Sequence, residues 1–273
     1  MRVHLLTCGY TTARAGIARR GAGWATVRFP ALVVAIEHPD GLVLFDTGYA
    51  PRVVEALGHG ADRLYGRLLP VHVEPDESVV AQLATHGMFA ADVRTVVLSH
   101  LHADHVGGLA DLPGARVVTD ARALVAARAR RGLARVRAGF VPPLVPAGTD
   151  VVDVTGLPVV DVPALAGTGP VRDLLGDGRL LVVELPGHLD GHLGMLVRTG
   201  DRDLLLVGDA AWSTRAITHL ELPHPALRGI VHDWSTYTAT VRALHDVAGR
   251  DPGLVVLPSH DEDAIAAARV ALT

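Results

Sequence analysis

The sequence contains no lysine and no asparagine, so all 25 of its basic residues are arginine. We attribute this bias to a GC-rich coding composition and not to function. The absence of lysine still excludes a Schiff-base lysine and a Walker-type phosphate-binding loop. Cys8 is the only cysteine, which excludes an intramolecular disulfide and a cysteine-based zinc cluster.

Long apolar runs are absent as well. A membrane-spanning helix needs about 18 or more consecutive apolar residues, and no such run occurs, so no membrane span is expected. The opening residues MRVHLLTCGY lack the apolar core of a signal peptide, which favours a cytoplasmic protein. A net charge of −4 gives no indication of a nucleic-acid partner.

Short apolar segments bounded by turn residues recur along the chain and predict buried strands. Strands are expected over 31–37, 42–45, 95–98, 116–119, 159–162, 180–185, 193–198, 203–207 and 254–258. The turn sequences HPDG and TGDR predict two hairpins. Helices are expected over 77–86, 121–138, 235–248 and 261–272, and the segment 132–149 is expected to be irregular and to cover part of the site. The fold class is therefore α/β.

Two apolar strands end in an aspartate after a hairpin turn. The first is LVLFD, which ends at Asp46, and the second is LLLVGD, which ends at Asp209. This short similarity indicates a duplicated unit with the functional site between its halves. No linker is evident, so we expect one domain over 1–273 with pseudo-duplicated halves of about 1–150 and 151–273.

The segment LSHLHADHVGGL, residues 98–109, places four polar side chains within six positions: His100, His102, Asp104 and His105. Such a cluster is costly to bury. Neutral imidazoles would keep hydrogen-bonding atoms without partners, and charged imidazoles would repel one another. A divalent metal removes this conflict by accepting the lone pairs. Alternate residues of an extended loop point the same way, so the first two imidazoles can share one ion. The other two side chains open the next helix and face a second ion.

Three more candidate ligands each follow an apolar strand: His188, Asp209 and His260. Strand ends can aim side chains at one point from a rigid scaffold. Gly107 and Gly108 are expected to let the backbone pass close to the site, because they have no Cβ.

Five segments together resemble the metallo-β-lactamase superfamily: LFDTG, SHLHADHVGG, PGHLDGH, GDAAW and PSHD. The resemblance implies a four-layer αβ/βα sandwich, with two mixed sheets flanked by helices, that holds two zinc ions. Carried over by position, it assigns His100, His102 and His188 to the first zinc. It assigns Asp104, His105 and His260 to the second zinc, with Asp209 and a hydroxide bridging both ions.

Several residues of this sequence differ from those of other branches of the superfamily, and these differences limit which branch it resembles. His102 stands where a redox di-iron branch has a carboxylate, and Asp209 stands where true β-lactamases often have Cys or Ser. Only 13 residues follow His260, too few for the helical domain of glyoxalase II-like thioesterases. The N-acyl-homoserine lactonases and related lactone or ester hydrolases remain. Those lactonases carry a Tyr three positions after the bridging aspartate, where this chain has Trp212, so the substrate can differ.

The implied reaction is hydrolysis by a metal-bridging hydroxide, with a small-molecule lactone or ester as substrate. The expected catalytic residues are Asp104 and Asp209, which would return the proton, and Trp212, which would stabilise the oxyanion; Tyr237 and Ser213 are alternative donors. We expect Asp46 to orient a metal-bound histidine and His192 not to be a ligand.

Other interpretations remain open at this point. The runner-up is a phosphodiester or thioester hydrolase, and another option is a tailoring enzyme of secondary metabolism. A different class is a metal-binding or sensor domain without catalysis. Such sites also accept iron, manganese or cobalt. A homodimer is compatible with the sequence; neither a nucleic acid nor a membrane is expected as a partner.

Overall fold

The computed structural model describes residues 1–272, which divide into two compact units. The first unit comprises Met1–Ala13 and Arg28–Asp153, and the second comprises Arg14–Val27 and the described residues from Val154 onward. Among the described residues, no helix combines the length and the apolar character that crossing a membrane requires.

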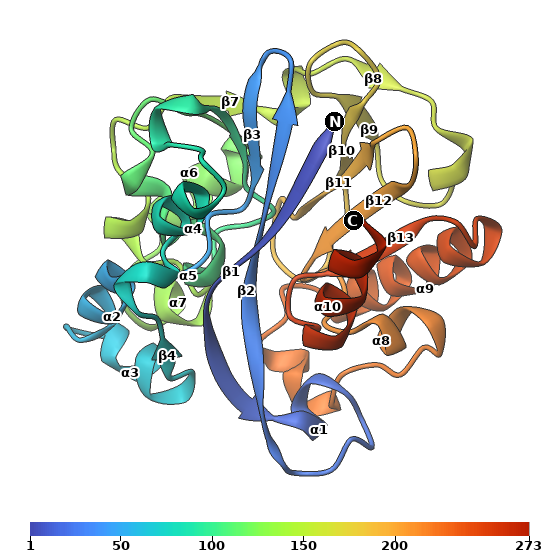
Figure 1. The fold of residues 1–273 in the computed structure, drawn as a ribbon. Coiled ribbons are helices and arrows are strands. Elements are labelled where there is room, and N and C mark those ends of the chain that lie inside the picture. The colour runs from blue at the N-terminus through green and yellow to red at the C-terminus, as the bar shows by residue number, and fades with distance from the viewer. Residues whose placement is uncertain (273) are drawn as a thin grey trace. The chain divides into compact units, whose positions relative to one another are not determined.

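The first unit is built on a seven-stranded mixed sheet in the order β4-β1-β2-β3-β5-β6-β7. Its strands are β1 (Arg2–Arg14), β2 (Thr26–His38), β3 (Gly41–Phe45), β4 (Val71–His72), β5 (Val93–Val97), β6 (Arg116–Thr119) and β7 (Val151–Asp153). Its helices are α2 (Pro51–Leu57), α3 (Asp62–Leu68), α4 (Val79–Thr85), α5 (Ala103–Val106), α6 (Ala121–Ala129) and α7 (Gly132–Arg137). Several of these helices gather beside the sheet (Figure 1).

The second unit is built on a six-stranded mixed sheet in the order β13-β12-β11-β10-β9-β8. Its strands are β8 (Val159–Val160), β9 (Val171–Asp173), β10 (Leu180–Glu184), β11 (Leu193–Arg198), β12 (Asp203–Gly208) and β13 (Val255–Pro258). Its helices are α1 (Ala15–Ala18), α8 (Thr214–Thr218), α9 (Trp234–Arg250) and α10 (Glu262–Ala271). Two mixed sheets flanked by helices confirm the predicted α/β class.

Both predicted hairpins are present. β2 pairs antiparallel with β3, and β11 pairs antiparallel with β12. Gly41 occupies the first turn with φ 117°, a conformation that glycine adopts without steric cost. The expected helix over 121–138 is wrong in its extent. It ends at Ala129, and α7 starts at Gly132, whose φ of 54° is incompatible with a continuous right-handed helix.

Parallel pairing brings the candidate site residues of each unit together at the C-terminal ends of neighbouring strands. In the first unit β3 and β5 are parallel, with Phe45 opposite Val97, so Asp46 and the histidine-rich segment begin side by side. In the second unit β12 and β13 are parallel, with Gly208 opposite Pro258, so Asp209 and His260 follow neighbouring strand ends. This arrangement explains why functional side chains follow strand after strand in the sequence.

Candidate metal centre

Asp46 is the buried centre of the polar cluster in the first unit. Its side chain has no exposed surface, and its φ of 62° is rare for a residue other than glycine. The Ser99 backbone N–H donates to Oδ1 at 2.7 Å, and the Ser99 hydroxyl donates to Oδ2 at 2.8 Å. The Nδ1 atom of His105 lies 2.7 Å from the same Oδ2. The carboxylate therefore ties the end of β3 to the segment that follows β5.

These contacts fix the tautomers of two histidines. A carboxylate can only accept, so the Nδ1–H of His105 donates to Asp46, and the Nε2 atom of that ring carries the lone pair. Ser99 gives its hydroxyl proton to Asp46, so its oxygen accepts from Nδ1 of His100, 3.0 Å away. Both rings then carry their lone pair on Nε2, the nitrogen that could hold a metal. This is the usual way in which a protein prepares metal-binding imidazoles.

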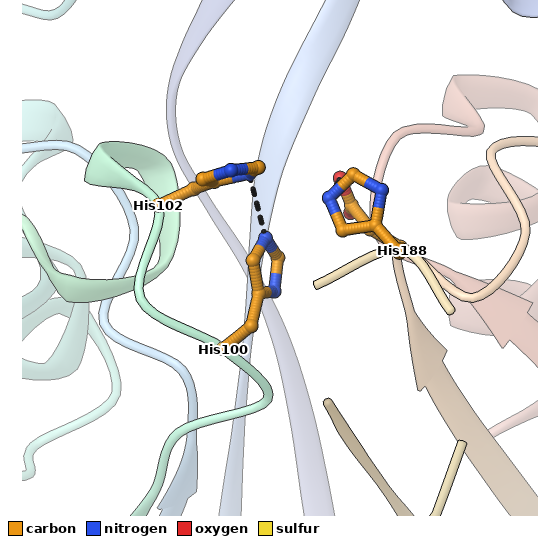
Figure 2. A group of neighbouring side chains, drawn as sticks. His100, His102 and His188 are labelled. Atoms are coloured by element: carbon orange, nitrogen blue, oxygen red, sulfur yellow. Dashed lines mark hydrogen bonds and ion pairs between the residues drawn. The ribbon is translucent and has the colours of Figure 1, made fainter. Parts of the chain in front are cut away.

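His102 turns its other ring nitrogen toward His100. Its Nδ1 atom lies 2.9 Å from Nε2 of His100, and Figure 2 shows the two ring nitrogens turned toward each other. The α5 helix that follows carries Asp104 and His105, whose Oδ2 and Nε2 atoms lie 3.6 Å apart. Candidate metal donors in this unit therefore comprise three imidazoles and one carboxylate.

Two glycines allow the backbone after β3 to lie against α5 and the turn beyond it. A Cβ on Gly107 would lie 2.6 Å from the carbonyl oxygen of Gly48, and one on Gly108 would lie 2.6 Å from that of Thr47. Thr47 also donates its backbone N–H and its hydroxyl to the carbonyl oxygen of His105, each at 2.8 Å. Gly107 and Gly108 therefore permit a close approach between this backbone and the 47–48 segment.

Asp209 is the centre of the second unit's cluster. Its Oδ2 atom lies 3.4 Å from Nε2 of His188, and its Oδ1 atom lies 3.0 Å from Nε2 of His260. The three side chains are buried or nearly so, and they are of types that could hold a metal. Figure 2 shows the His188 ring, which comes from the loop after β10. One carboxylate oxygen faces each imidazole.

Neighbouring side chains hold Asp209 in place. The indole N–H of Trp212 donates to Oδ2 at 3.1 Å, and its ring packs edge-on against His188 with centroids 5.8 Å apart. The backbone N–H of Asp209 donates to Nε2 of His192 at 3.1 Å. His192 thus supports the aspartate backbone. The indole N–H donates to the aspartate, and not to the oxyanion that the sequence predicts for it.

The two alternative donors differ in their surroundings. Tyr237 is fully buried, and burial together with the negative charge of Asp209 raises the pKa of its phenol above the usual range, so it stays protonated. The hydroxyl of Ser213 accepts the backbone N–H of Ala216 at 3.2 Å and caps α8. Ser213 therefore has a structural role that explains its presence.

The donor chemistry fits a divalent metal. Neutral imidazoles and carboxylates are ligands for zinc and for several other first-row metals, and no thiolate is required. The hydrogen bonds of His105 to Asp46 and of His100 to Ser99 leave on each ring the deprotonated nitrogen that a metal needs. Sequence reasoning found the histidines and aspartates but missed Ser99, whose hydroxyl connects His100 to Asp46.

Comparison with known proteins agrees with this chemistry. The family model described as the metallo-beta-lactamase superfamily matches residues 26–260, so the chain belongs to that superfamily. A probable metallo-hydrolase of Mycobacterium bovis is 30% identical, and the alignment covers 98% of this chain and 83% of that protein. The N-acyl homoserine lactonase AttM of Azorhizobium caulinodans is also 30% identical, over 88% of this chain and 85% of that protein.

A solved structure shows the same fold at lower identity. It is a variant of AiiA from B. thuringiensis with N-decanoyl-L-homoserine bound, and it is 16% identical. It covers 97% of this chain and 95% of that one with a TM-score of 0.73. The family and its relatives identify the chain as a metal-dependent hydrolase.

Proposed function

We propose that the chain is a dinuclear zinc hydrolase that opens a lactone or cleaves an ester. One set of donors would be His100, His102 and His188, and the other would be Asp104, His105 and His260. Asp209 would bridge the two ions. The observation that carries the proposal is the position of Asp209, whose two oxygens face different imidazoles, one from each proposed set.

The metals, when bound, would lower the pKa of a bridging water and polarise the substrate carbonyl. The chain's own residues supply the rest of the chemistry. Asp46 and Ser99 hold the Nδ1 protons of His105 and His100, which keeps the ligand nitrogens deprotonated. Asp104 and Asp209 are the carboxylates that can carry a proton to the leaving alkoxide.

The indole of Trp212 keeps one oxygen of Asp209 in place. This gives Trp212 a task different from that of the tyrosine found at the same position in the well-known lactonases. Groups other than the Trp212 indole would then orient the substrate. The relatives that act on N-acyl homoserine lactones support a lactone as the first substrate class to examine.

The experiment is a hydrolysis panel of lactones, carboxylic esters, thioesters and phosphodiesters, measured with and without a chelator. We expect lactone or ester turnover that a chelator abolishes and added zinc restores. The Asp209→Ala and His102→Ala variants should both be inactive. Phosphodiester or thioester cleavage alone would replace the proposed substrate class. Turnover that persists in both variants after chelation would refute metal-dependent hydrolysis.

A further inference from the structure

Gly139 lies against the imidazole of His102. It follows α7 with φ 62°, and its N–H donates to the carbonyl oxygen of Val136 at 2.9 Å, which ends the helix. A Cβ at this position would lie 2.7 Å from Nε2 of His102, and nearer still to Cδ2. Real Cβ atoms essentially never approach that closely. A side chain at this position would therefore displace the His102 ring, and the φ of 62° adds strain for a residue other than glycine.

The contact falls on one particular edge of the ring. Cδ2 and Nε2 face Gly139, whereas Nδ1 faces His100 at 2.9 Å, as Figure 2 shows for the two histidines. Gly139 thus lies on the side of the ring away from its proposed ligand atom. Rotation of the imidazole away from His100 would drive it into the Gly139 backbone.

An ion pair fixes the segment that carries Gly139. Arg135 on α7 donates from Nη1 to the carbonyl oxygen of Phe140 at 2.9 Å. Its Nη2 atom donates to Oδ2 of Asp62 on α3 at 3.0 Å, and Nη1 lies 2.8 Å from Oδ1. The Arg135 and Asp62 side chains are only 15% and 13% exposed. A two-point arginine–carboxylate pair of this kind is geometrically stiff.

We propose that Gly139, held by the Arg135–Asp62 pair, is a positioning residue that aims Nδ1 of His102 at the first metal ion. The inference rests on the proposed function, because it takes His102 as a ligand. It assigns a purpose to two features that the metal motif alone does not explain. One is the glycine after α7, and the other is the partly buried ion pair between Arg135 and Asp62.

The test compares Gly139→Ala with Gly132→Ala. Both glycines have positive φ, 62° and 54°, but a Cβ on Gly132 would meet nothing within 4 Å. The two variants therefore share the backbone penalty and differ in the contact with His102. Zinc affinity is measured by competition with a chelator, and the visible absorption of the cobalt-loaded protein reports the ligand geometry.

We expect Gly139→Ala to weaken binding of one ion by about tenfold or more and to change the cobalt spectrum. Gly132→Ala should stay within about twofold of the wild-type affinity, since it touches no ligand. In a His102→Ala background the Gly139→Ala change should have almost no further effect on affinity, because the ring it displaces is gone. Equal affinities for the two glycine variants would overturn the proposal.

Arg135→Gln provides a second variant that adds no atom beside His102, in case Gly139→Ala does not fold. It should weaken the same ion, and Arg131→Gln, an exposed neighbour, should not. Unchanged zinc affinity in folded Arg135→Gln would refute the role of the ion pair. A wild-type protein that binds no metal, or a His102→Ala variant with unchanged affinity, would refute the proposed ligand set itself and the inference with it.

Discussion

The carboxylate of Asp46 and the imidazole of His105 are separated by 59 positions in sequence, yet Oδ2 of the first lies 2.7 Å from Nδ1 of the second. Both side chains are fully buried. Because the same Oδ2 also accepts the Ser99 hydroxyl, one carboxylate sets the protonation of two candidate ligands. The sequence predicts that Asp46 orients a histidine; in the structure it contacts His105 directly and reaches His100 through the Ser99 hydroxyl.

Asp46→Asn is predicted to lower metal affinity by about ten- to a hundredfold. Asparagine tolerates the positive φ at this position, so the backbone should survive. The asparagine amide has one oxygen that accepts and one NH₂ group that donates, so it cannot accept hydrogen bonds at both positions where the aspartate oxygens do. The tautomers of His100 and His105 are then no longer fixed. Titration with zinc against a chromophoric chelator measures the change. The exposed Asp201→Asn serves as control, and equal affinity in the two variants would contradict the prediction.

Trp212→Phe should lower kcat by about two- to tenfold with little change in KM, because it removes one hydrogen bond to Asp209 and keeps an aromatic ring beside His188. Steady-state kinetics on the best substrate of the panel give both constants. A large rise in KM with unchanged kcat would instead place the indole in contact with the substrate.

A bridging role for Asp209 predicts an unequal pattern of metal loss. Asp209→Ala should weaken both ions, whereas His188→Ala and His260→Ala should each weaken one, because each imidazole faces a different carboxylate oxygen. Equilibrium dialysis with elemental analysis of each variant gives the stoichiometry. Loss of a single ion in Asp209→Ala would show that the aspartate binds only one metal.

Acid stability should depend in part on Asp233, the N-cap of α9. Hydrogen bonds from the Ser235 side chain and the Thr236 backbone lower the pKa of this carboxyl from 3.8 to about 2. Because the pKa of this carboxyl is lower in the folded state than in the unfolded state, the ionised carboxylate stabilises the fold above about pH 4. This stabilisation is lost as the pH falls toward 2 and the carboxylate becomes protonated. The Tm advantage of wild type over Asp233→Asn should therefore be constant from about pH 5 to 7 and shrink below pH 4. A pH-independent difference would contradict this.

Much of the fold follows from local patterns. The hairpins β2–β3 and β11–β12 were predictable from their turn residues, and the ligand candidates were predictable because each follows an apolar strand. The 121–138 helix was predicted too long, since helix-favouring alanines and arginines hide the break before Gly132. Ser99 and Gly139 could not be assigned from sequence, because their roles depend on tertiary contacts with Asp46 and His102.

The most direct measurement of the central claim is the metal content of the purified protein, determined by elemental analysis beside the lactone assay with and without chelator. The account predicts about two zinc ions per chain, one for each proposed donor set, and lactone opening that stops when they are removed. One iron per chain with no hydrolysis would contradict it.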